Sequence, residues 1–353
     1  MKEGASSKSE YAKILGTASR LSFILKRLHP RRKRELTLSQ TRRAHLRTIS
    51  LALGATALGL PAAAQDLPKV RVMVLAADLF AGAYYAQDNG FFKSPRPLNV
   101  ELIPTANAGA NVAAILGGAA DIAISNPITI AEAISRGGQV TIIAGAGLYS
   151  TNAATTVLCV AKTSPMSTVK DLEGKTIGVF AINDAATSAL REYLSRGGVD
   201  VSKVHFVEIP FAIMGEALAN GRVDASMILE PVLTSVVGKS ARVFAKPFDA
   251  VAPQFLLTVW CATTDWVKNN PDLARRFVAD IYACGKWANA HHDETAVSLA
   301  KFAKMDVAVV RATTRGIQAE TLTPQLIQPL LDIAFKYNIL PRGVRAEEMI
   351  AKL

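Results

Sequence analysis

Cysteine and histidine are scarce in this chain, which limits the chemistry that it can offer. Its 353 residues include three Cys and five His, and only three of the His follow residue 64. The spacing of Cys159, Cys261 and Cys284 matches neither a zinc motif nor a disulfide framework. We therefore expect buried free thiols, no bound metal and no cofactor. A Cys159–Cys261 bridge remains the alternative, because both segments are expected to cross between two lobes.

The sequence also lacks the motifs of common enzymes. No Gly-x-Ser-x-Gly elbow, phosphate-binding loop or His-Glu-x-x-His helix occurs in it. His205 opens a predicted strand, and the adjacent His291 and His292 point in different directions on a predicted helix. These patterns favour solvated polar residues over a metal site, so no catalytic residue is assigned.

A long hydrophobic run is missing as well. The apolar segment from Ile49 to Leu60 is shorter than the roughly 20 residues that span a membrane. It follows the basic pair Arg42-Arg43 and precedes a small-residue stretch that ends at Ala64. These parts are typical of an export signal cleaved near Ala64, by either the twin-arginine or the general secretory route. We therefore expect residues 1–64 to be a leader and the mature protein to be periplasmic.

The basic charge of the chain belongs to this leader. Residues 1–64 hold 13 of the 40 Lys and Arg but 3 of the 29 Asp and Glu. The remaining residues hold 27 basic and 26 acidic side chains, a formal charge of +1. Because nucleic-acid binding needs clustered positive charge, we expect no nucleic-acid partner.

One motif appears twice in the mature chain. Its elements are an Ile-Pro pair, an apolar stretch, a Gly-x-x-Asp turn and a second strand followed by Pro. The two copies run from Ile103 to Pro127 and from Ile209 to Pro231. Each copy predicts strand, helix and strand, and two such units about a hundred residues apart predict two similar α/β lobes with a cleft between them.

The expected fold class is therefore α/β with two lobes, each built on a mainly parallel, doubly wound sheet. Residues 65–154 and 264–353 are predicted to form a discontinuous first lobe. Residues 155–263 are predicted to form the second lobe, including the crossover strands. Two crossings between the lobes would act as a hinge.

With these features in place, the chain resembles the type II solute-binding proteins of ABC importers, in the nitrate, sulfonate, taurine and thiamine-precursor (NMT1/SsuA-like) group. The similarity spans nearly the whole mature chain, and the order and spacing of its motifs carry it. The matching segments are Ala83 to Phe92, Gly118 to Ala123, Asp171 to Val179, and Gly221 to Ala225 followed by Glu230-Pro231. The resemblance implies a monomeric periplasmic receptor, without catalytic activity, that closes on a small molecule and docks on an inner-membrane ABC permease.

Loops that open helices at the carboxyl ends of strands are the candidate ligand contacts, because helix N-termini offer unpaired backbone N–H groups. Several residues of these loops are also good helix caps, and capping alone is an alternative role for them. Glu230 has a hinge hydrogen bond as a further alternative. The candidates are Asp78, Leu79, Phe80, Asn107, Ala108, Ser125, Asn126, Asn183, Asp184, Ala185 and Glu230.

The candidate loops contain three carboxylates but no Arg or Lys. This composition disfavours a small inorganic anion such as nitrate. It favours a taurine-like zwitterion or a neutral, pyrimidine-like heteroaromatic molecule, whose apolar part would pack against Phe80 or Trp260. A sulfonate, as implied by the family, completes the expected range. The alternatives are a periplasmic ligand sensor and a pyrimidine-synthesis enzyme on the same fold. That enzyme family uses a cysteine-rich motif, which this sequence lacks.

Overall fold

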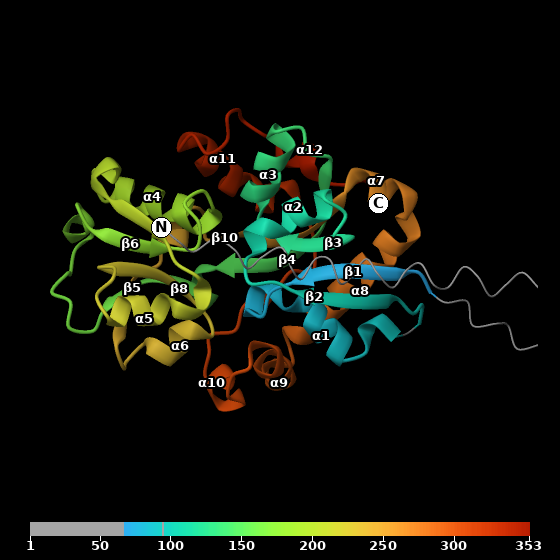
Figure 1. The fold of residues 1–353 in the computed structure, drawn as a ribbon, viewed down its shortest axis with the longest axis horizontal. Coiled ribbons are helices and arrows are strands. Elements are labelled where there is room, and N and C mark those ends of the chain that lie inside the picture. Colours follow the sequence, from blue (N-terminus) through green and yellow to red (C-terminus); the bar gives the residue numbers. More distant parts are fainter. Residues whose placement is uncertain (1–66, 94) are drawn as a thin grey trace, which may run out of the picture. The chain divides into compact units, whose positions relative to one another are not determined.

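The computed structural model describes residues 67–93 and 95–353 (Figure 1). The predicted leader lies outside the described residues. Within this range, no helix combines the length and the apolar character that a membrane crossing requires.

Two mixed β-sheets organise the described chain, one in each lobe. The first sheet has the strand order β11 (Ile317–Gln318), β4 (Val140–Ser150), β10 (Gln254–Thr263), β3 (Ile122–Ser125), β1 (Lys69–Val74) and β2 (Asn99–Pro104). The second has the order β9 (Ala241–Ala245), β5 (Thr156–Ala161), β8 (Ala225–Leu229), β6 (Thr176–Val179) and β7 (His205–Glu208). This arrangement confirms the predicted two-lobed α/β class.

The two sheets repeat one topology. In the first, β1 pairs in parallel with β2 and β3, and β10 pairs antiparallel with β3 and β4. In the second, β6 pairs in parallel with β7 and β8, and β5 pairs antiparallel with β8 and β9. Each sheet is therefore mixed, because the strand that crosses from one lobe to the other runs against its neighbours.

The motif repeated in the sequence has the same structural role in both lobes. Asp121 accepts a hydrogen bond from Arg71 N at 2.8 Å, and Asp224 accepts one from Thr176 N at 2.9 Å. Each Asp, one residue before β3 or β8, thus ties the start of that strand to the central parallel strand of its sheet, β1 or β6. The turn before it contains a glycine with positive φ, Gly118 at 77° and Gly221 at 68°, a conformation that glycine adopts without strain.

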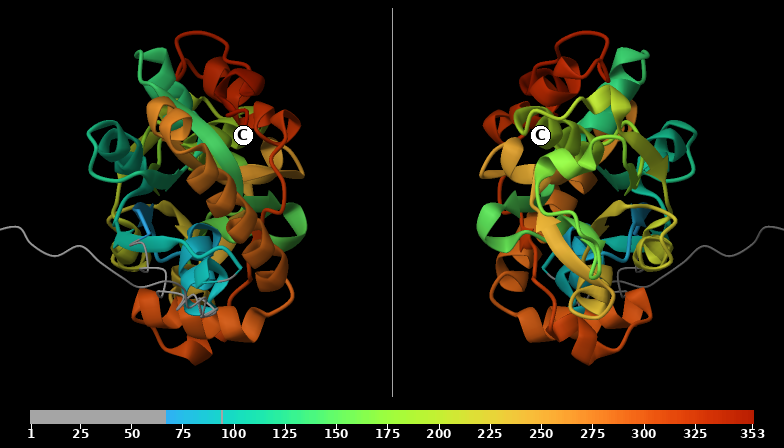
Figure 2. Two further views of the ribbon diagram at one scale, coloured as in Figure 1. Left: turned by 90° about the vertical axis from the view of Figure 1, so that its right-hand side faces the viewer. Right: turned by 90° about the vertical axis from the view of Figure 1, so that its left-hand side faces the viewer.

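Helices cover both faces of each sheet (Figures 1 and 2). On one face of the first sheet lie α1 (Gly82–Asp88), α8 (Pro271–Ala288) and α9 (His292–Ala303). On its other face lie α2 (Asn111–Leu116), α3 (Pro127–Ser135), α11 (Gln328–Lys336) and α12 (Ala346–Met349). The second sheet lies between α4 (Ala185–Arg196) on one face and α5 (Met214–Ala219) and α6 (Val232–Val236) on the other. The short helices α7 (Thr264–Asn269) and α10 (Val307–Arg311) complete the set of described α-helices.

Two chain crossings join the lobes, between β4 and β5 and between β9 and β10. They lie side by side, because Thr151 N donates to Pro253 O at 3.0 Å. The Asp249 carboxylate accepts from Tyr149 Oη at 2.6 Å and from Thr151 Oγ1 at 2.7 Å. Beneath this junction the rings of Tyr149, Phe248 and Phe255 pack with centroids 5.1–5.6 Å apart. The hinge region is therefore a bonded pair of strands with an aromatic core.

Two features of the lobes differ from the sequence-based boundaries. The sequence assigns residues 255–263 to the second lobe as a crossover strand, whereas β10 pairs with β3 and β4 of the first sheet. The C-terminal helices, expected to pack only on the first lobe, also reach the second. Lys336 Nζ lies 2.7 Å and Tyr337 Oη 2.9 Å from Glu192 Oε2 on α4.

Candidate ligand-binding site

A cleft of about 800 Å³ lies where the carboxyl ends of the parallel strands of both sheets meet. Strands β1, β2 and β3 of the first sheet and β6, β7 and β8 of the second all end at it. Ligands of open α/β sheets bind at this edge, and the volume suits a small molecule. The lining residues closest to these strand ends are Leu75, Ala106, Asn126, Phe180, Glu208 and Leu229.

One face of α3 forms a wall of the cleft. Asn126, Thr129, Glu132 and Arg136 line it, at the spacing of three or four residues that places side chains on one helix face. Asn126 caps the helix, because its Oδ1 accepts from Thr129 N at 3.0 Å. Glu132 lies 3.6 Å from Arg136 Nη2. The burial of Glu132 raises the pKa of its carboxyl, and the positive charge of Arg136 lowers this pKa in part.

The N-terminus of α4 forms the opposite wall. Asp184 is its N-cap and accepts from Thr187 N at 2.8 Å. Burial raises the pKa of Asp184 to about 6, despite the hydrogen bonds from Thr187 and Ala186 that lower it. The nearby charge of Glu208 contributes to the increase. Glu208 is exposed at the end of β7, and its Oε1 accepts from Ile182 N at 2.8 Å.

Apolar side chains form the rest of the cleft. Phe80, Phe180 and Phe211 are half-buried, and Phe248 from the hinge region is buried. Leu75 and Leu257 lie between them. The cleft therefore combines aromatic surfaces with a few polar groups, which is the usual composition of a site for a small organic molecule.

Seven of the residues predicted from the sequence line this cleft together. They come from three loops of the first lobe and one loop of the second. They are Phe80, Asn107, Ala108, Asn126, Asn183, Asp184 and Ala185. Asn107 also caps a short helical turn by accepting from Gly109 N at 2.8 Å. Asn183 is exposed and does not cap α4, because Asp184 does.

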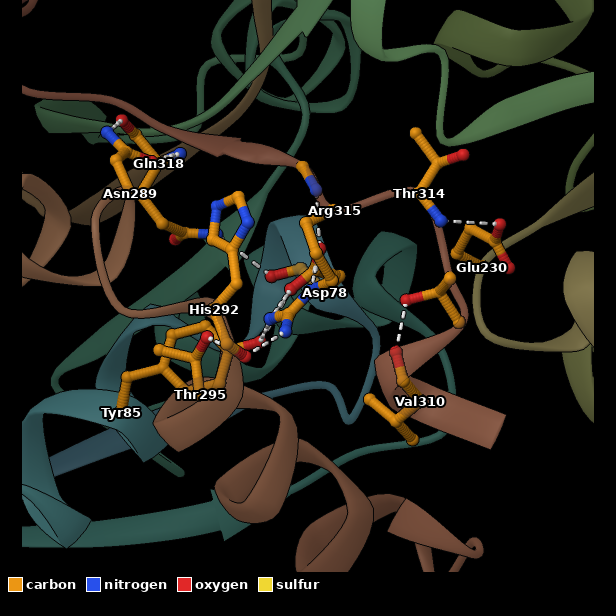
Figure 3. A network of polar contacts seen from close by, with 12 residues as sticks. Asp78, Tyr85, Glu230, Asn289, His292, Thr295, Val310, Thr314, Arg315 and Gln318 are labelled. Atoms are coloured by element: carbon orange, nitrogen blue, oxygen red, sulfur yellow. Dashed lines mark hydrogen bonds and ion pairs between the residues drawn. The ribbon is translucent and has the colours of Figure 1, made fainter. Parts of the chain in front are cut away.

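The other four candidates do not line the cleft. Asp78 is 2% exposed and paired with Arg315, whose Nη2 lies 2.7 Å from Asp78 Oδ1 (Figure 3). Tyr85 Oη donates to the same oxygen at 2.6 Å, and Gly316 N donates to Oδ2 at 2.5 Å. Leu79 is buried beside this network. Burial lowers the pKa of the Arg315 guanidinium, but the hydrogen bonds with Asp78 and the charge of Asp78 raise it, and the net shift is upward.

Glu230 and Ser125 are buried as well. Glu230 accepts from Thr234 N at 3.0 Å on α6 and from Thr314 N at 3.2 Å in the C-terminal segment (Figure 3). Its burial raises the pKa of the carboxyl, and these hydrogen bonds oppose the increase. Ser125 Oγ donates to Ala108 O at 3.2 Å. These bonds support the loops around the cleft and tie the lobes together.

The sequence reasoning did not identify Thr129, Glu132, Arg136, Glu208 or Phe211. The regular spacing of polar residues after Asn126 is a signal that could have identified the face of α3. Glu208 and Phe211 flank the second Ile-Pro pair, which the sequence pattern marks only as the end of a strand. The expectation of a site without Arg or Lys therefore holds for the loops but not for the wall that α3 adds.

The three cysteines and the three histidines that follow residue 64 do not line the cleft. Cys159, Cys261 and Cys284 are buried free thiols, and burial raises the pKa of each to about 12. Cys159 lies in β5 and Cys261 in β10, so the alternative of a bridge between them is wrong. No group of three or more metal-binding side chains occurs in the part of the chain that the structure describes.

The fold is that of a two-lobed α/β protein with a cleft between its lobes. The NMT1/THI5-like family profile matches residues 78–295, more than half of the sequence. The chain belongs to this family. A comparison with curated protein sequences found no match.

Solved structures share the fold at low sequence identity. The periplasmic aliphatic sulphonate binding protein SsuA from Escherichia coli is 17% identical, with a TM-score of 0.66 over 80% of this chain and 92% of that chain. The alkanesulfonate-binding protein SsuA from Xanthomonas axonopodis pv. citri, bound to MOPS, is 18% identical, with a TM-score of 0.69 over 81% and 99%. The periplasmic nitrate-binding protein NrtA from Synechocystis PCC 6803 is 12% identical, with a TM-score of 0.66 over 80% and 85%.

Proposed function

We propose that this chain is the solute-binding protein of an ABC importer, and that it captures a small organic molecule in the cleft and delivers it to a membrane permease. The observation that carries the proposal is the position of the cleft. It lies at the carboxyl ends of the parallel strands of two equivalent sheets, and two adjacent crossings join these sheets. Lobes connected in this way can close around a ligand by a hinge motion.

Family membership and the relatives' names support the same function. The similar structures are named for binding sulphonates, an alkanesulfonate and nitrate, and two of the three are called periplasmic. The leader proposed for residues 1–64 would export the protein to that compartment. Sulfonates, taurine-like zwitterions and pyrimidine-like heteroaromatic molecules form the proposed ligand range.

The cleft also gives a reason to propose binding without catalysis. Within the described part of the chain, its lining includes no Cys, His or Lys, and no Ser hydroxyl as a nucleophile. A pyrimidine-synthesis enzyme on this fold would need a reactive Cys or His, whereas the thiols here are buried elsewhere. A sensor that passes its ligand state to a membrane protein would bind in the same way and is distinguished by its partner.

Thermal unfolding of the purified protein with a panel of sulfonates, amino acids, pyrimidines and aromatic acids tests this function. A specific ligand should raise the free energy of unfolding by about 2.7 kcal/mol at a hundredfold excess over Kd. The variant Phe180→Ala should lose this response, since it removes an aromatic wall of the cleft. Val243→Ala, an exposed position in the second lobe, provides a control.

Chromatography of the ligand after incubation completes the test, because a receptor returns its ligand unchanged. Chemical conversion of any compound in the panel would contradict the proposal. Stabilisation that persists in Phe180→Ala would place the binding site outside the cleft.

A further inference from the structure

The charges that line the cleft are predominantly negative. Three carboxylates, Glu132, Asp184 and Glu208, line it, and Arg136 is the one basic residue among the described residues of its lining. The side chain of Arg136 is 78% exposed, and its Nη2 lies 3.6 Å from Glu132 Oε1. This guanidinium is therefore partly neutralised within its own helix and faces solvent.

The helix N-terminus that would suit an anion is already occupied by a carboxylate. The first turn of α4 lines the cleft, and the N–H groups at the start of a helix attract negative charge. Asp184 supplies that charge and accepts from Thr187 N at 2.8 Å. On α3 the corresponding cap is the Asn126 amide, which accepts from Thr129 N at 3.0 Å. At the start of α4, the charge of Asp184 would therefore repel a bound anion. At the start of α3, the Asn126 amide already accepts from a backbone N–H group.

Glu208 leaves acceptor capacity that faces the cleft. One of its oxygens accepts from Ile182 N at 2.8 Å. Among residues 67–93 and 95–353, no hydrogen bond involves the second oxygen, Oε2. Glu208 ends β7, and Asp184 caps the helix that follows β6, the strand paired with β7. The two are close enough that the charge of Glu208 raises the pKa of Asp184. A cation between them would relieve this repulsion.

The remaining surface favours an apolar body. Phe80 projects from the first lobe, Phe180 and Phe211 from the second, and Phe248 from the hinge. Aromatic faces bind rings by stacking and attract cations through their π electrons. Stacking therefore favours a ligand with a ring. The attraction of the π electrons for a cation adds to the attraction of the carboxylates.

We infer that the ligand of this cleft is a small organic cation, with a protonated amine or amidine group held against Asp184 and Glu208 and an apolar or aromatic body packed on the phenylalanines. This inference depends on the proposed function, because it takes the cleft as the solute site. It narrows the ligand range proposed above by removing sulfonates that lack an amine, because they carry a negative charge without a compensating cation, and it disfavours nitrate for the same reason.

Four probes of one shape test the sign of the charge. Benzamidine is a cation, benzamide is neutral, and benzoate and benzenesulfonate are anions, while all four carry the same ring. Titration calorimetry above pH about 7, where Asp184 with its pKa of about 6 is ionised, should give benzamidine a Kd at least about tenfold below that of either anion. Tighter binding of benzoate or benzenesulfonate would overturn the inference while leaving the receptor function intact.

A charge-removing variant tests the location. Glu208→Gln should weaken benzamidine binding by about tenfold and leave the affinity for benzamide within about twofold. Glu216→Gln makes the same chemical change at an exposed position of the second lobe outside the cleft and should have no effect. Unchanged benzamidine affinity in Glu208→Gln would overturn the inference, as would an absence of binding by all four probes. The receptor function is judged separately, by the unfolding panel.

Discussion

Asp184 has two opposing effects on stability. As the N-cap it stabilises α4, whereas its ionised carboxylate destabilises the fold because it is partly removed from water. Its Oδ1 satisfies Thr187 N in the first turn of the helix. Its burial at the cleft raises its pKa from 3.8 to about 6, so the folded protein holds a proton there more tightly than the unfolded chain does. The contribution of Asp184 to stability is therefore most favourable below pH 3.8 and is lost as the pH rises through about 6.

Asp184→Asn should therefore stabilise the protein near neutral pH. Asn caps helices as well as Asp does, and it removes the buried charge. We expect a gain of about 1 kcal/mol in the free energy of unfolding above pH about 7, with no gain below pH about 4. Urea unfolding at a series of pH values measures this difference. A variant that is less stable than the parent at neutral pH would show that the attraction between the carboxylate and the helix dipole outweighs its desolvation.

At the scale of elements, the repeated turn before β3 and β8 is built on two glycines in the left-handed region. Gly118 and Gly221 have φ of 77° and 68°, and an added Cβ would meet nothing within 4 Å at either position. The cost of an alanine there is thus the backbone strain alone, without a steric clash.

Gly118→Ala and Gly221→Ala should each lower the free energy of unfolding by about 1–2 kcal/mol. Gly343→Ala is the matched control, since its surroundings are equally open and its φ lies outside the left-handed range. Guanidinium unfolding of the three variants measures the difference. Equal stability of Gly118→Ala and Gly343→Ala would contradict the explanation.

Most strands and helices could be predicted because their signals are local. The helix expected over residues 185–196 is α4, Ala185–Arg196, and the strand expected over 176–180 is β6, Thr176–Val179. The partners of the candidate residues could not be predicted, because they are distant along the chain. Asp78 pairs with Arg315, 237 residues away, and Glu230 accepts from Thr314, 84 residues away. No sequence periodicity reports such a contact, so two buried structural carboxylates appeared as ligand contacts.

At the scale of the whole described chain, the C-terminal segment forms ties between the lobes in addition to the two crossings. Thr314 bonds Glu230 of the second lobe, and the adjacent Arg315 bonds Asp78 of the first. Further along, Lys336 and Tyr337 bond Glu192 on α4. These ties should restrict how far the lobes separate.

Glu192→Leu should loosen the lobes, because it removes both bonds to the C-terminal segment. We expect a larger radius of gyration in small-angle X-ray scattering without ligand, and a ligand affinity a few-fold weaker because the binding-competent arrangement is less populated. Glu173→Leu is the control, since its ion pairs with Lys170 and Lys203 remain within the second lobe. Scattering identical to that of the parent would show that the two crossings alone fix the arrangement.

The exchange of strands between the lobes limits how this protein can be divided. β10, encoded after the second lobe, pairs with both β3 and β4 of the first sheet, and β5, which follows β4, pairs with both β8 and β9 of the second. A fragment that ends at Ser150 would lack β10 and leave the edges of β3 and β4 unpaired, and such edges recruit other chains. Keeping one lobe alone would therefore expose strand edges, and circular permutation is the safer route for relocating the ends of this chain.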